Sequence, residues 1–158
     1  MSLDLVVWLS CSIALPQDLP RDAEWSYHKS SSAGLPNIPK ELAALIDGQE
    51  SWQVNRDKYL IRASYTVESV ELQSPRDLPA VRSPAVEEIS RFAKRQADLA
   101  ERASRSKVSV SLVLEGDYDA GYPEQSAIAT HLAQKCKGGV VEGPTGLFQV
   151  DNLGEWSQ

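Results

Sequence analysis

The segment "KVSVSLVLEGDYDAGYPEQ", residues 107–125, joins a strand pattern to an acidic loop and a helix pattern. Its first part alternates strictly, so that the apolar residues at every second position from Val108 to Leu114 share one face of a predicted β-strand. Acids, glycines and tyrosines follow, and Pro123 is expected to begin a helix, because proline favours the first helical turn. The segment therefore predicts a strand, a loop and a helix in direct succession.

The flanking patterns complete the order of elements. Leu3–Cys11 is apolar on both faces, which is typical of a covered strand. A short helix is expected within Asn37–Gly48, a strand pair within Trp52–Val70, and a long amphipathic helix after an N-cap at Ser83. Gly139–Val150, "GVVEGPTGLFQV", predicts a C-terminal β-hairpin. This mixed order predicts an α+β fold, with helices packed on one mainly antiparallel sheet.

Composition and charge narrow the class of protein. The chain has 158 residues, of which 42% are hydrophobic and 24% charged, so we expect a single folded domain over residues 1–158. The net charge of −6 disfavours sequence-independent binding to nucleic acid, because an acidic surface repels phosphates. Such a charge suits a basic protein partner, or simply solubility.

The apolar run near the N-terminus and the two cysteines indicate the cellular compartment of the protein. The run lacks a basic start and carries Asp4, so it is interpreted as a strand rather than a signal peptide. No apolar run approaches the roughly 20 residues of a membrane helix. Cys11 and Cys136 could form one disulfide, but their strand-end and helix positions favour reduced, apolar side chains. A cytoplasmic protein is expected, with no membrane partner.

Metal and cofactor motifs are weak. The sequence has no phosphate-binding glycine loop, and two cysteines with two histidines do not predict a zinc site. Asp117 and Asp119 are spaced as in calcium loops, but the glycine and glutamate positions of an EF-hand do not match. These acids are interpreted instead as a solvated turn that caps the next helix. No metal and no cofactor is expected.

Catalytic patterns are equally weak. His131 lies in a helix pattern without a nucleophile turn beside it, and His28 lies in a polar loop. Paired carboxylates such as Glu87 and Glu88 are common at helix starts, where they interact favourably with the helix dipole. No catalytic residue is predicted, and a non-enzymatic protein is expected.

Recognition of a partner is the function that the acidic loop favours. Tyrosine offers a large contact area at low entropic cost, and nearby carboxylates steer a cationic partner. The competing interpretation is that one tyrosine covers the core and the acids are merely hydrated. Trp25, Tyr27 and His28 are a weaker second candidate. The predicted partner-binding residues are Asp117, Tyr118, Asp119, Tyr122 and Glu124.

The two ends of the chain resemble a known class of proteins. "MSLDLVVWL" at residues 1–9 and "AIATHLAQKCKGGVVEGPTGLFQV" at residues 127–150 are similar to the ends of small bacterial ferredoxin-like α+β proteins. Several such families are immunity proteins for polymorphic or secreted toxins. The resemblance covers about the first ten and last twenty-five residues and transfers no functional residue. It implies that the protein binds and neutralises a cognate bacterial toxin with a basic surface.

Two other functions stay open on the sequence. A small enzyme could have an unrecognised pocket beneath the loop Asp18–Ser32, in which case a cleft should hold a histidine or carboxylate with a shifted pKa. A homodimeric structural or regulatory module is the other, because sheets of this type can associate through an edge or a face.

Overall fold

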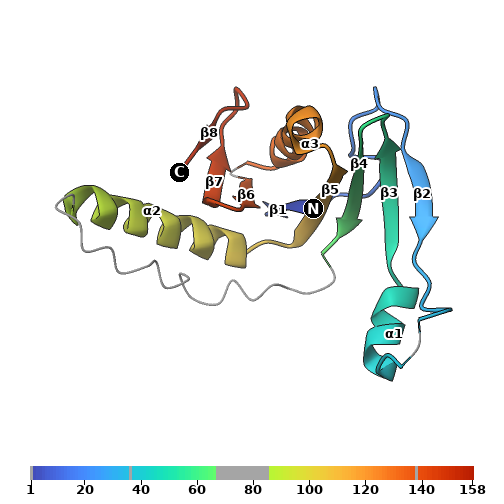
Figure 1. The fold of residues 1–158 in the computed structure, drawn as a ribbon. Helices are drawn as coiled ribbons and strands as arrows, with labels where there is room; N and C mark the ends of the chain where they lie inside the picture. The colour runs from blue at the N-terminus through green and yellow to red at the C-terminus, as the bar shows by residue number, and fades with distance from the viewer. Residues whose placement is uncertain (1, 36, 67–85, 138) are drawn as a thin grey trace.

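A computed structural model describes residues 2–35, 37–66, 86–137 and 139–158 (Figure 1). Three helices belong to these residues: α1 (Lys40–Asp47), α2 (Val86–Ser104) and α3 (Tyr118–Ala133). The strands are β1 (Ser2–Leu9), β2 (Ser26–Lys29), β3 (Glu50–Asn55), β4 (Tyr59–Tyr65), β5 (Val108–Gly116), β6 (Val140–Gly143), β7 (Gly146–Val150) and β8 (Trp156–Ser157).

All eight strands form one sheet in the order β2-β3-β4-β5-β1-β6-β7-β8, and neighbouring strands are antiparallel. The prediction of an α+β fold with a mainly antiparallel sheet is confirmed. The predicted hairpin near the C-terminus is present as β6 and β7. β1 lies inside the sheet, between β5 and β6, which agrees with its apolar residues on both faces.

One face of the sheet packs against α3. The register pairs Leu5 with Leu112 and Val7 with Val110, so the predicted apolar face of β5 is buried with that of β1. α3 contacts β1, β5, β4 and β6, and its fully buried Leu132 belongs to the same core cluster. The alternation in the sequence therefore fixed which side of β5 faces the helix.

The opposite face carries a second, smaller core. Trp8 alternates with Val7 and lies on this side, where it clusters with Leu99 and Ala103 of α2. α2 contacts β6 and β7, so it covers the half of the sheet that contains the hairpin (Figure 1). The predicted N-cap Ser83 lies outside the described residues.

Some predicted element boundaries are wrong. α3 begins at Tyr118 rather than at Pro123, which lies inside the helix. The helix can start earlier because Asp117 caps it, although Pro123 removes one N–H donor and its ring crowds the carbonyl four residues earlier. The segment interpreted as an irregular loop contains β2, a fully exposed edge strand without apolar alternation.

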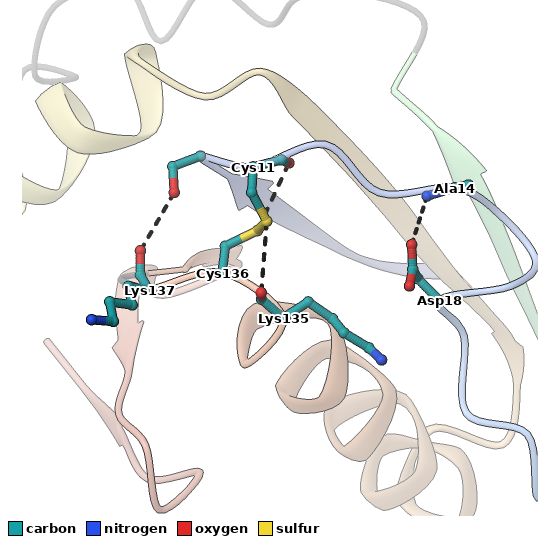
Figure 2. Close-up of a disulfide and its surroundings, with 7 residues drawn as sticks. Cys11, Ala14, Asp18, Lys135, Cys136 and Lys137 are labelled. Atoms are coloured by element: carbon teal, nitrogen blue, oxygen red, sulfur yellow. Dashed lines mark hydrogen bonds between the residues drawn. A yellow bond between two sulfur atoms is a disulfide. The ribbon is translucent and has the colours of Figure 1, made fainter.

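The prediction that the two cysteines are reduced is also wrong. Cys11 and Cys136 form a disulfide with their Cα atoms 5.7 Å apart (Figure 2). Cys11 follows β1 and Cys136 follows α3, so the bond joins the sheet to the end of the helix that covers it. Beside it, the Ser10 hydroxyl donates to the Lys137 carbonyl at 3.4 Å, which holds the same two segments together.

Candidate functional site

The acidic loop is fixed to the β3–β4 turn and to the start of α3. The Asp117 side chain accepts from the Ala120 N–H at 3.1 Å and is the N-cap of the helix. The Asp117 N–H donates to the Lys58 carbonyl at 2.9 Å. Gly116 permits this approach, because its φ of 106° disfavours side chains and a Cβ there would lie 3.0 Å from the Tyr59 Cα. The loop is thus a defined structural corner.

Two tyrosines one helical turn apart stack at this corner. The Tyr118 and Tyr122 ring centroids are 5.3 Å apart with an interplanar angle of 28°. Tyr118 is 45% exposed, whereas Tyr122 is half-buried and packs against the main core. Burial raises the pKa of Tyr122, and the neighbouring Tyr118 raises it further. Tyr122 therefore covers the core, as one of the two interpretations expected, whereas the Tyr118 ring stays exposed.

The acids of the loop have different surroundings. Asp119 is exposed and makes no hydrogen bond or ion pair within the described part of the chain. Glu124 instead accepts two hydrogen bonds from the Arg56 guanidinium, at 2.8 and 3.0 Å, and one from the Tyr59 hydroxyl at 2.9 Å. The hydrogen bonds from Arg56 hold the pKa of Glu124 below its ordinary value. Glu124 is thus committed to joining α3 to the β3–β4 turn.

The structure brings four of the five predicted residues together at the start of α3. We call Asp117, Tyr118, Asp119 and Tyr122 the tyrosine–carboxylate surface. Glu124 is set apart from them by its hydrogen bonds to Arg56 and Tyr59. Asp117 is partly occupied by its capping role, which leaves Tyr118 and Asp119 as the residues most available to a partner.

A cavity of about 450 Å³ lies on the Glu124 side of α3, beneath the loop segment Pro20–Ala23. The buried Leu19 anchors the loop in the main core, and within the loop the Trp25 indole N–H donates to the Pro20 carbonyl at 2.9 Å. The sequence had left open a small enzyme with a pocket in this region, beneath the loop Asp18–Ser32. The described lining residues include Arg21, Asp22, Glu124, Ile128 and His131.

His131 is a residue of this cavity that could serve as a proton acceptor. Burial lowers the pKa of His131, as does the charge of Lys135, which follows the end of α3. The Asp18 carbonyl and the charges of Asp18 and Asp22 on the loop act in the opposite direction but do not prevail. A neutral imidazole can accept a proton. None of the described lining residues is a serine, threonine, cysteine, lysine or tyrosine, so a nucleophile in this cavity would have to be Asp22, Glu124 or His131.

Acidification is expected to destabilise the protein partly through His131. Its folded-state pKa is depressed, so below about pH 6.5 the unfolded chain binds the proton more readily and stability falls with pH. Urea unfolding at pH 7.5 and pH 5.5 measures this loss. The His131→Gln variant should show a smaller loss than wild type, whereas His28→Gln, which changes an exposed residue on β2, should match wild type. Equal losses in wild type and His131→Gln would contradict the role of His131.

Comparisons with protein-family models, with curated proteins and with solved structures find no match for this chain. Within the described ranges, no helix has the length and hydropathy needed to cross a bilayer.

Two features of the site were missed in the sequence. Arg56, in the β3–β4 turn, is the partner of Glu124 across 68 residues, and His131 is covered by the loop that contains Asp18. No local pattern signals either contact, because both depend on how distant segments pack. The acidic run and its paired tyrosines were visible in the sequence itself.

Proposed function

We propose that the protein is a non-enzymatic binding protein that recognises a protein with a basic surface through the tyrosine–carboxylate surface. The observation that carries this proposal is the exposed Tyr118 ring stacked on the half-buried Tyr122. The stacking restricts Tyr118 before a partner arrives, so less side-chain entropy is lost on binding. Exposed tyrosines that meet these conditions are typical anchors of protein interfaces.

Charge supports the choice of a basic partner. Asp119 is exposed beside the tyrosines and has no partner within the described residues, and the whole chain carries a net charge of −6. Carboxylates at the rim of an interface raise the association rate with a cationic protein more than they raise affinity. The surface combines an aromatic anchor with this steering charge.

More specifically, we propose an immunity protein that neutralises a cognate bacterial toxin by covering its surface. This proposal rests on the resemblance of the chain ends to ferredoxin-like immunity families. On the same resemblance we also propose that the fold has the ferredoxin-like topology. The disulfide between Cys11 and Cys136 indicates the compartment in which the protein would meet the toxin, because disulfides persist in oxidising compartments. It favours an oxidising compartment over the cytoplasm expected from the sequence.

Two alternatives each retain one supporting observation. The cavity at His131 is what a small enzyme would need, and its described lining supplies acid–base groups in Asp22, Glu124 and His131. The exposed edge strand β2 could pair with a second copy, which would make a homodimer. Size-exclusion chromatography with light scattering measures the mass of the particle and separates the dimer from a monomer.

The test uses the purified product of a toxin gene adjacent to the gene of this protein, with binding measured by biolayer interferometry. Tyr118→Ala is expected to weaken binding by about tenfold or more, through faster dissociation. Asp119→Lys should mainly slow association, and more so at low salt. Tyr27→Ala tests the weaker candidate on the edge strand β2, where Tyr27 is 56% exposed against 45% for Tyr118, and retained binding by this variant assigns the loss to Tyr118.

The charge is reversed at Asp119 and not at Asp117, because loss of the Asp117 N-cap would cost roughly 0.5–2 kcal/mol of stability. Thermal unfolding of Tyr118→Ala and Asp119→Lys should stay close to wild type, so that changes in binding report on the interface. Wild-type binding by both variants would remove this surface from the interface. Failure of the wild type to bind or to protect cells would refute the immunity proposal.

A further inference from the structure

The sheet ends on one side at β2, whose outer edge has no strand beside it in the part of the chain that the structure describes (Figure 1). The strand at the other edge, β8, is only two residues long, whereas β2 has four residues, all of them exposed. A free strand edge presents backbone N–H and C=O groups that can pair with another strand. β2 is therefore the longer of the two edges at which this sheet can be extended.

The ladder between β2 and β3 shows which backbone groups of β2 are free. The Ser30 N–H donates to the Gln49 carbonyl at 2.9 Å, directly after the last residue of β2, and the register is continuous along the strand. Because bonded and non-bonded pairs alternate along an antiparallel ladder, the backbone groups of Tyr27 and Lys29 point away from β3. Two donors and two acceptors are thus directed outward along this edge.

The side chains of these residues lie on the sheet face that α3 covers. Tyr27 pairs with Trp52, and their rings meet edge-on with centroids 5.8 Å apart and an interplanar angle of 62°. Trp52 belongs to the main core, yet Tyr27 is 56% exposed. Trp25 packs against the same core, and Lys29 shares this face because side chains two apart in an extended chain do so. The edge therefore presents Trp25, Tyr27 and Lys29 in one row.

This row is complementary to itself. When two copies of β2 meet antiparallel with Tyr27 of each on the two-fold axis, Lys29 of one copy lies opposite Trp25 of the other. A cation beside an indole ring is favourable, and so is a cross-strand pair of tyrosines. On the other face Ser26 lies opposite His28, so no two like charges meet. Lysine on an edge strand often hinders sheet extension, but in this register it gains an aromatic partner.

We propose that β2 is a dimer interface, at which two copies of this chain pair antiparallel with Tyr27 on the two-fold axis. An extended segment of another protein could use the same backbone groups, but the self-complementary row favours a second copy. A two-fold contact of this kind is closed and joins only two chains. It gives the homodimer a defined register, and it does not depend on the tyrosine–carboxylate surface at the start of α3. The purified protein alone therefore tests it, without a toxin.

Cysteine cross-linking tests the register. Tyr27→Cys places two cysteines opposite each other across the axis, with Cα atoms about 5.5 Å apart, a distance that a disulfide spans. His28→Cys is the matched control on the same exposed strand, because its two copies are diagonal neighbours that lie too far apart. Cys11 and Cys136 are bonded to each other, so the introduced thiol is the one that reacts. On non-reducing gels after mild oxidation, Tyr27→Cys should form a covalent dimer at least ten times faster than His28→Cys.

Sedimentation velocity tests the association without an added cysteine. The mass of the wild type should rise with concentration toward twice that of the chain. Tyr27→Pro should weaken the dimer about tenfold or more, because it removes the central hydrogen bonds of the dimer but no bond to β3. Thermal unfolding shows whether this variant folds, and if it does not, the cross-linking still decides.

Three results would overturn the proposal. The first is a wild type that sediments as a monomer at every concentration. The second is cross-linking of His28→Cys as fast as that of Tyr27→Cys. The third is a dimer that a folded Tyr27→Pro variant retains at full strength, which would place the contact elsewhere on the molecule.

Discussion

Replacing Cys136 by alanine is expected to lower the free energy of unfolding by about 2–5 kcal/mol. The disulfide joins residues 125 apart in sequence, so it closes a loop that includes most of the chain and restricts the unfolded state strongly. It also fixes the end of β1 to the end of α3, two elements that share the main core. Urea unfolding of the wild type and the variant measures the difference.

The bond, rather than the side chains, should account for this loss. Cys11→Ala, Cys136→Ala and the double variant should therefore lose similar amounts, because each removes the same bond and the effects are not additive. Reduction with dithiothreitol should destabilise the wild type to the same extent and leave the variants unchanged. If a variant does not fold, the reduction of wild type still tests the prediction. Equal stability of the oxidised and reduced wild type would refute it.

Gln125→Glu is expected to destabilise the protein by about 3–5 kcal/mol at pH 7. Gln125 is fully buried in α3, and its amide nitrogen donates to the Leu3 and Leu112 carbonyls at 3.0 and 2.9 Å. A carboxylate cannot donate, so it would face two carbonyl oxygens in an apolar core without compensation. The side chain would also lose the contacts that join α3 to both β1 and β5.

The pH dependence of this variant has a defined sign. Burial should raise the folded-state pKa of the introduced glutamate, so its penalty is smallest below about pH 4.3 and grows as pH rises. Gln125→Met is the control of similar size, and it should cost only about 1–3 kcal/mol from the unpaired carbonyls. Urea unfolding of both variants against the wild type at pH 4 and pH 7 measures the effect. Equal stability of the two variants at pH 7 would contradict this account.

Local patterns in the sequence predicted the parts of the fold that depend on local physics. The strict alternation from Val108 to Leu114 predicted β5 and its buried face, and the glycine-flanked run after Gly139 predicted the β6–β7 hairpin. β2 was missed because its four residues are all exposed and have no apolar alternation to detect. β8 is only two residues long and exists through its pairing with β7.

The candidate site shows the same division between local and distant contacts. Asp117, Tyr118 and Tyr122 could be proposed from their spacing, since caps and one-turn pairs are local features. The pairing of Glu124 with Arg56 and the disulfide of Cys11 with Cys136 join segments 68 and 125 residues apart. Only the packing of the whole sheet brings such residues together, so the sequence pattern had no means of predicting them.

The position of β1 sets the order in which the chain can complete its sheet during synthesis. Both neighbours of β1, the strands β5 and β6, begin at residues 108 and 140, so a nascent chain exposes an unpaired apolar strand until most of it has left the ribosome. The charged, exposed Asp4 within that strand limits its self-association during this interval. Newly made chains should therefore aggregate mainly through β1, and production should benefit from chaperones that shield it until β5 and β6 have been made.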